Sequence, residues 1–186
     1  MNNFPAGLTT PATKLIDVCL QPGEYFVGHA IYRIRTVLGS CVSMTLWCPL
    51  QRIGAMSHFM LASRGPAVGG FRLARDAKYG DESMALMLEE LGRLSVQASQ
   101  CQAKIFGGGD MFPGYKQSGA LEVGRRNGEA ARSLLRAHGI ALSSESLFGA
   151  GHRQIVFDIG SGDVWSRQVP PITDAAETEE TEESLE

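Results

Sequence analysis

The sequence TVLGSCVSMTLWCPLQRIGAMSHF, residues 36–59, contains two apolar runs separated by a bend with a proline. Such runs predict two neighbouring antiparallel strands. Cys41 precedes the first run and His58 lies in the second, so strand pairing would bring their side chains close together across the ladder. A thiol within reach of an imidazole is the minimum requirement for a cysteine nucleophile with its base.

Spacing alone leaves open whether Cys41 is a reactive residue or part of the core, because cysteine is among the most buried residue types. Strand alternation places the apolar side chains of Val42, Met44 and Leu46 on one face. The other, more polar face carries Cys41, Ser43, Thr45 and Trp47. A position on this face beside Gly39 favours an accessible thiol, and pairing with a histidine would lower the pKa of that thiol.

The stretch resembles the chemoreceptor glutamine deamidases of the CheD family, both in LGSCV and in a histidine seventeen residues after the cysteine. Three later segments occur in the family's order and spacing: AKIFGGGDMF at 103–112, VGRRNGEAARSLLRAHGI at 123–140 and RQIVFDIGSGDV at 153–164. The resemblance covers about residues 20–169. LGSC alone would be a weak signal, but its combination with the spaced histidine and GGGDMF is specific.

The resemblance implies a catalytic role for three side chains. Cys41 would attack the amide carbonyl, His58 would pass the thiol proton to the departing ammonia and then activate water, and Thr36 would orient the imidazole. Family members carry this threonine six residues before the cysteine, where this chain has Arg35. Either the strand register differs in this chain, or another group orients His58.

Further residues of these segments are candidates for substrate binding. Three consecutive glycines after a strand allow a close approach of the backbone, and the resemblance places them beside the cysteine. The two arginines at 125–126 precede the expected helix and are either solvated or an anchor for a carboxylate. The candidates are Ser40, Gly107, Gly108, Gly109, Arg125 and Arg126.

The periodicity of the chain predicts an α+β fold, with a mostly antiparallel sheet and two main helices on one side of it. The first helix would be capped by Asp81, and the second would begin at Asn127 and end at Gly139. The apolar stripe of the first helix, which we expect in the core, comprises Met84, Met87, Leu88, Leu91 and Leu94. The resemblance implies a layered α/β sandwich that is shared with cysteine deamidases of the necrotizing-factor type.

Composition indicates a single domain over residues 14–170, with a flexible arm at 1–13 and a disordered acidic tail at 171–186. Asp174–Glu186 holds seven of the 20 acidic residues, so the rest of the chain is slightly basic, but it has no basic cluster typical of nucleic-acid binding. The chain has no apolar run of transmembrane length, no secretory signal and no metal-binding spacing of its four cysteines. We therefore expect a cytoplasmic protein without metal, cofactor, nucleic-acid binding or membrane insertion.

The function implied by the resemblance is hydrolysis of glutamine side chains to glutamate on methyl-accepting chemotaxis receptors. The receptors are the expected partners, and a CheC-like phosphatase is a further candidate. Two other functions remain open, namely a non-enzymatic chemotaxis adaptor that binds receptors or a CheC-type phosphatase, and a cysteine peptidase. His152 remains an alternative to His58 as the base.

Overall fold

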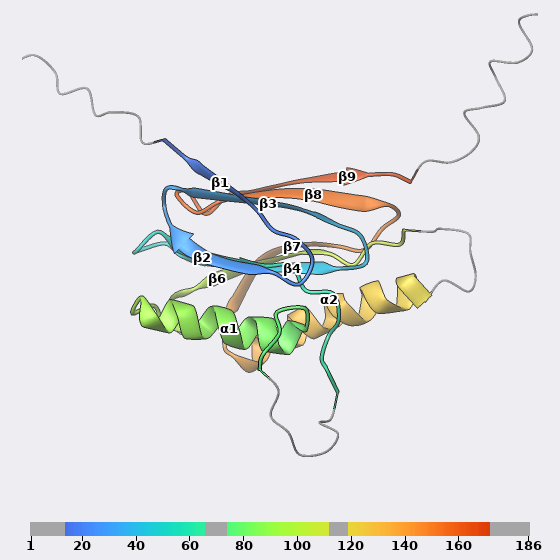
Figure 1. The fold of residues 1–186 in the computed structure, drawn as a ribbon, viewed down its shortest axis with the longest axis horizontal. Helices are drawn as coiled ribbons and strands as arrows, with labels where there is room; N and C mark the ends of the chain where they lie inside the picture. The colour runs from blue at the N-terminus through green and yellow to red at the C-terminus, as the bar shows by residue number, and fades with distance from the viewer. Residues whose placement is uncertain (1–13, 66–73, 112–118, 172–186) are drawn as a thin grey trace, which may run out of the picture.

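Two stacked sheets and a layer of helices make up the molecule, as the computed structural model shows for residues 14–65, 74–111 and 119–171 (Figure 1). The strands are β1 (Ile16–Cys19), β2 (Tyr25–His29), β3 (Tyr32–Leu38), β4 (Val42–Cys48), β5 (Ile53–Ser57), β6 (Gln102–Gly107), β7 (Ala141–Leu147), β8 (His152–Asp158) and β9 (Val164–Val169). The helices are α1 (Gly80–Arg93), α2 (Gly119–Ala137) and the short 3-10 helix η1 (Ala98–Gln100). The arm expected at 1–13 and the tail expected beyond residue 171 lie outside the described residues.

The strands divide into a four-stranded sheet of order β1-β3-β8-β9 and a five-stranded sheet of order β2-β5-β4-β6-β7. Most neighbouring strands are antiparallel, and the pairs β1–β3 and β6–β7 are parallel. The predicted α+β class and the mostly antiparallel pairing are therefore confirmed. The expectation of one sheet covered by helices is incomplete, because a second sheet lies on the face of the first that the helices leave uncovered (Figure 1).

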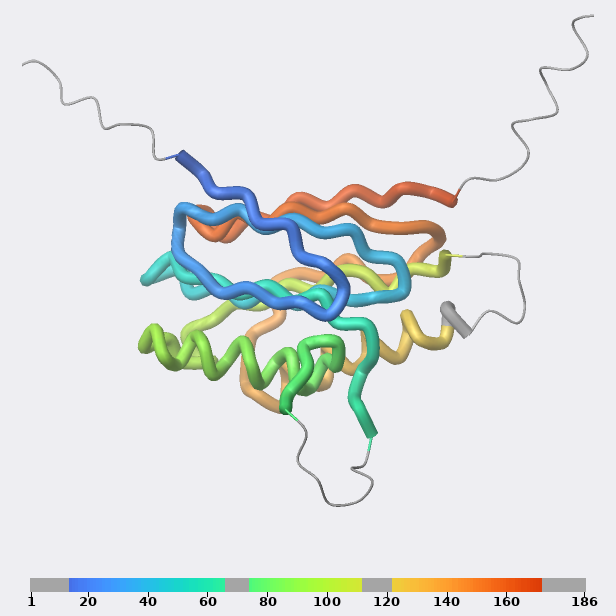
Figure 2. Tube along the Cα trace, in the orientation of Figure 1, coloured from blue at the N-terminus to red at the C-terminus, as the bar shows by residue number. Residues whose placement is uncertain are grey.

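The chain crosses from one sheet to the other within the stretch that carries the cysteine. β3 pairs with β8 in the four-stranded sheet, whereas β4 pairs with β5 and β6 in the five-stranded sheet. Gly39 and Ser40 connect the two strands, and Figure 2 shows the tube passing between the layers at this point. As a result, Thr36 belongs to the four-stranded sheet, whereas Cys41, five residues later, lies at the start of a strand of the five-stranded sheet.

Two cores hold the three layers together. The core between the five-stranded sheet and the helices buries the β4 residues Val42, Met44 and Leu46. It also contains Met84, Met87 and Leu91 of α1, with Leu88 and Leu94 packed at its margin, so the predicted apolar stripe is confirmed. The core between the sheets includes Ile34, Leu38, Met56, Phe106, Ile155 and Phe157. Burial of large apolar side chains on both faces of the five-stranded sheet is the main stabilising contribution.

The predicted starts of the helices need correction. α1 begins at Gly80 with no side-chain cap, and Asp81 lies in its first turn, where its carboxylate accepts a hydrogen bond from the N–H of Glu82. α2 begins at Gly119, so Asn127 is an interior residue of the helix and not its cap. Gly139, with a φ of 65°, follows the end of α2 as predicted. Within the described residues, neither helix is long and apolar enough to cross a membrane.

Candidate active site

The side chains of Cys41 and His58 lie on the same face of the five-stranded sheet. The β4–β5 register pairs Thr45 with Met56 and continues to an isolated bridge between Val42 and Phe59. In this register Cys41 and His58 are diagonal neighbours across the ladder, a separation that side chains can span. The predicted proximity of the cysteine and the histidine is therefore consistent with the strand register.

This face of the sheet is not exposed to solvent, in contrast to what its polar composition suggested. Ser43 and Thr45 are buried, and Cys41 is half-buried against the core between the sheets. The hydroxyl of Ser43 has no hydrogen-bond partner among the described residues. Cys41 is thus partly accessible, at the edge of a face whose other polar side chains, Ser43 and Thr45, are buried.

His58 is held by hydrogen bonds of its own backbone and of its neighbour. Its N–H donates to the carbonyl of Glu24 at 2.8 Å, and its carbonyl accepts from the N–H of Gly23 at 2.8 Å. The next residue, Phe59, exchanges two backbone hydrogen bonds of 3.0 Å with Val42. His58 is consequently fixed between β4 and the turn that leads into β2.

Thr36 contacts the imidazole from the opposite sheet. Its Oγ1 lies 2.8 Å from Nδ1 of His58 and 2.8 Å from the carbonyl oxygen of Leu20. A carbonyl can only accept, so the single hydroxyl proton is donated to Leu20 and the threonine oxygen accepts the proton on Nδ1. This tautomer leaves the lone pair on Nε2 available to take a proton.

Burial keeps both members of the pair neutral. Desolvation lowers the pKa of His58 to about 4, although the Leu20 carbonyl and the Glu24 carboxylate oppose this shift. Burial also raises the pKa of the Cys41 thiol, which corrects the expectation of a lowered value. These pKa shifts favour a neutral thiol on Cys41 and a neutral imidazole on His58 at neutral pH over a thiolate–imidazolium ion pair.

The glycine segment after β6 supports the turn that carries Cys41. The N–H of Gly108 donates to the carbonyl of Cys41, and that of Gly109 donates to the carbonyl of Gly39, both at 2.8 Å. Gly107 has a φ of 112°, and a Cβ at this residue would lie 2.2 Å from the Cys41 carbonyl oxygen. The N–H groups of Gly108 and Gly109 are therefore occupied, and the N–H of Cys41 lies within hydrogen-bonding reach of the thiol of the same residue.

A buried arginine holds the same glycine segment from the other sheet. Arg153 of β8 donates to the carbonyl of Gly107 at 3.3 Å and to that of Phe148 at 3.2 Å. Burial lowers the pKa of its guanidinium group. Alternation along β8 directs Arg153 into the core between the sheets and the neighbouring His152 to the outer face, which favours His58 over His152 as the base.

The remaining candidates lie around the cysteine turn in different settings. Ser40 is half-buried, and its carbonyl accepts a hydrogen bond from the side chain of Asn127. Arg125 and Arg126 are exposed residues of α2 and not of a segment before it, and Arg126 forms an ion pair with Glu122. A role of these residues in substrate binding stays a prediction.

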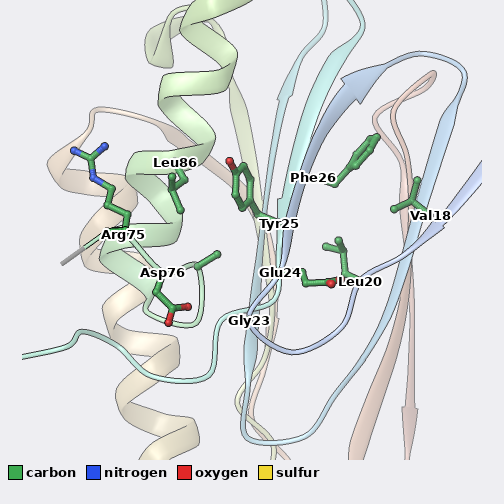
Figure 3. Close-up of a pocket in the computed structure, with 11 residues that line it drawn as sticks. Val18, Leu20, Gly23, Glu24, Tyr25, Phe26, Arg75, Asp76 and Leu86 are labelled. Carbon is green, nitrogen blue, oxygen red and sulfur yellow. The ribbon is translucent and has the colours of Figure 1, made fainter.

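An open pocket beside this region is not the candidate site itself. It lies between β1, β2 and the start of α1, where Figure 3 shows Tyr25 and Leu86 facing each other. Its lining includes Leu20 and Glu24, whose carbonyls accept the hydrogen bonds from Thr36 and His58, but not the three proposed catalytic residues. The pocket therefore adjoins the residues that hold Thr36 and His58, and not the Cys41 thiol.

Sequence reasoning missed the contacts of Asn127 near the candidate site, because it interpreted this residue as a helix cap. The side chain is 1% exposed, and its amide contacts the segments on both sides of the site. The sequence offers no local signal for such contacts, because asparagine before an alanine-rich helix is equally typical of a cap.

Comparisons with known proteins agree with the resemblance. A family model described as "CheD chemotactic sensory transduction" matches residues 60–168. The protein named "Probable chemoreceptor glutamine deamidase CheD 2" from Albidiferax ferrireducens is 65% identical over 86% of this chain and 91% of its own length. One named "Probable chemoreceptor glutamine deamidase CheD 3" from Dechloromonas aromatica is 40% identical over 85% of this chain and 91% of its own. The solved Bacillus licheniformis hypothetical protein YfiH has a TM-score of 0.38 and 13% identity over 66% of this chain and 49% of that chain, a likeness too slight to bear on the fold.

Proposed function

The chain belongs to the CheD family, and we propose that it hydrolyses the side-chain amides of specific glutamines on methyl-accepting chemotaxis receptors to glutamate and ammonia. The observation that carries the mechanism is the contact of Thr36 with Nδ1 of His58, which leaves the lone pair on Nε2 of the imidazole free to take a proton. Members of the family at 65% and 40% identity are named for this activity.

The first half of the reaction transfers the acyl group to the cysteine. Sγ of Cys41 attacks the carboxamide carbon of the glutamine while Nε2 of His58 takes the thiol proton. The neutral resting pair makes proton transfer part of the attack itself, because the thiolate is not formed beforehand. The N–H of Cys41 stabilises the negative oxygen of the intermediate. His58 then gives its proton to the nitrogen, the C–N bond breaks, and ammonia leaves behind a thioester.

The second half releases glutamate. Water loses a proton to Nε2 of His58 and attacks the thioester carbon. The C–S bond breaks, the proton returns to the sulfur of Cys41, and the product leaves as a carboxylic acid that loses its remaining proton to solvent. Thr36 keeps the ring in one tautomer through both halves by accepting the Nδ1 proton. Hydrolysis of a glutamyl methyl ester would follow the same steps with methanol as the leaving group.

Partners and setting follow from this activity. The cytoplasmic domain of a chemotaxis receptor is the substrate, a CheC-like phosphatase is a second candidate partner, and the cytoplasm is the compartment. Ser40, Gly107, Gly108, Gly109, Arg125 and Arg126 are the candidate substrate contacts. The layered arrangement shared with necrotizing-factor-type cysteine deamidases is supported by the helices on one face of a mostly antiparallel sandwich.

The test is an incubation of the protein with a receptor cytoplasmic domain, in which ammonia and new peptide amines are both measured. We expect ammonia to be released without new amines, and release to cease in Cys41→Ala. New amines would instead indicate a peptidase. Binding without either product would leave only the adaptor function.

A further inference from the structure

We infer that Asn127 is a positioning residue, which holds the cysteine turn and the histidine segment at the spacing that the reaction needs. The inference rests on the proposed roles of Cys41 and His58. Asn127 lies in the interior of α2 and touches neither side chain in the hydrogen bonds of the described residues. Its contribution would therefore act through the backbone of both segments.

The amide of Asn127 bridges the two segments directly. Its Nδ2 donates to the carbonyl of Met60 at 2.8 Å and to the carbonyl of Ser40 at 3.2 Å. Ser40 immediately precedes Cys41, and Met60 follows His58 by two residues. An amide nitrogen carries two protons, so each carbonyl receives one and both donors are used.

The amide of Asn127 joins the two segments beyond a point where the ladder between them is interrupted. Continuous β4–β5 pairing ends at Thr45 and Met56, and beyond it the N–H of Met44 donates at 3.2 Å to the hydroxyl of Ser57 and not to a backbone carbonyl. Past this interruption, the two strands pair again through the backbone bridge between Val42 and Phe59. Cys41 and His58 flank this two-bond bridge, and the amide of Asn127 adds a contact between their segments.

A glycine contact brings α2 close enough for the bridge. A Cβ on Gly124 would lie 2.7 Å from the carbonyl oxygen of Gly108, and a Cβ on Gly108 would lie 2.7 Å from the carbonyl oxygen of Gly124. Gly124 is one helical turn before Asn127, on the same side of α2. The helix backbone thus rests on the glycine segment that supports Cys41, and Asn127 reaches over it to the two carbonyls.

The experiment compares Asn127→Ala and the isosteric Asn127→Asp, whose ionised carboxylate can only accept, with the wild-type protein in receptor deamidation. The matched control is Trp47→Phe, which removes one side-chain hydrogen bond to a carbonyl (Nε1 to Ile159, 2.9 Å) at the opposite end of β4. All rates are normalised to folded protein well below each melting temperature. We expect kcat to fall between about tenfold and about a hundredfold in the Asn127 variants with KM nearly unchanged, and to stay near the wild-type value in the control. A kcat within about twofold of wild type in both Asn127 variants, whatever happens to KM, would overturn the inference.

A second measurement separates positioning from a purely structural role and needs no receptor. Alkylation of Cys41 is followed in a Cys19→Ser background, since the other two cysteines are buried. Asn127→Asp should change the alkylation rate when His58 is present and have little further effect in His58→Ala, because the residue acts through the pair. The same change in both backgrounds would contradict positioning. Loss of deamidation in Cys41→Ala together with full kcat in the Asn127 variants would reject this inference alone, whereas an active Cys41→Ala would reject the proposed function.

Discussion

At the residue scale, the Thr36 hydroxyl decides which nitrogen of His58 is free. Thr36→Val keeps the shape of the side chain but removes the acceptor for Nδ1, and the stranded Leu20 carbonyl should also cost about 1 kcal/mol of stability. We expect kcat to drop between about tenfold and about a hundredfold while Thr36→Ser retains most of it. The adjacent Arg35→Ala is the matched control, because this exposed side chain lies on the opposite face of β3. Equal loss in the Arg35 variant would mean that the loss is not specific to the contact of Thr36 with His58.

Burial of His58 should also make folding stability depend on pH. The folded pKa of about 4 lies below the ordinary value of 6.5, so between these values the unfolded chain binds more protons than the folded one. Stability is then fully present above pH 6.5 and is lost as the pH falls through 4. Urea unfolding from pH 7 to pH 4 should show about 3 kcal/mol more loss in the wild type than in His58→Gln. Parallel pH profiles for the two proteins would show that the folded pKa of His58 is not lowered.

The four cysteines should differ in reactivity in an order set by burial. Cys19 is exposed, Cys41 is half-buried with a raised pKa, and Cys48 and Cys101 are buried. Alkylation of the native protein near neutral pH, read by mass spectrometry, should label Cys19 first, Cys41 more slowly, and the two buried thiols only after unfolding. Labelling of Cys41 ahead of Cys19 would indicate a thiolate–imidazolium pair and contradict the neutral pair described above.

At the element scale, the contact of α2 with the glycine segment reverses the usual effect of a helical glycine. Gly124→Ala places a Cβ against the carbonyl oxygen of Gly108 and should destabilise the protein by about 1–3 kcal/mol. Gly92→Ala in α1 is the control, since a Cβ at this residue would meet no atom of the described neighbouring residues within 4 Å, and it should stabilise by about 0.5 kcal/mol. Thermal unfolding of both variants measures the difference. A stabilising Gly124→Ala would show that the helix does not rest on this segment.

The strands of the site show where sequence reasoning reaches its limit. The apolar runs were sufficient to predict the pairing of β4 with β5. Alternation could not decide between Arg35 and Thr36, since a shift of one residue exchanges the two faces of a strand. Only the register of β3 against β8, which pairs Thr36 with the buried Ile155, directs the threonine inward.

At the scale of the whole molecule, the division into two sheets was the part that could not be predicted. The crossing at Gly39 and Ser40 has the composition of an ordinary turn, and nothing local distinguishes a hairpin within one sheet from a connection between two. For the same reason the polar face of β4 was expected to be accessible, whereas the second sheet covers it and shifts the pKa values of Cys41 and His58. The family and the proposed pair of Cys41 and His58 could be approached from sequence because they rest on short, linear motifs.

Mass mapping of a receptor cytoplasmic domain shows whether the whole protein deamidates receptor glutamines. Wild-type protein should convert particular glutamine-containing peptides to products heavier by about one dalton, the mass difference between an amide and a carboxylic acid. Cys41→Ala should give no such product, while Cys48→Ala, altered in the core on the other face of β4, should give it in proportion to its folded fraction. A full yield of converted peptide from Cys41→Ala would contradict the account.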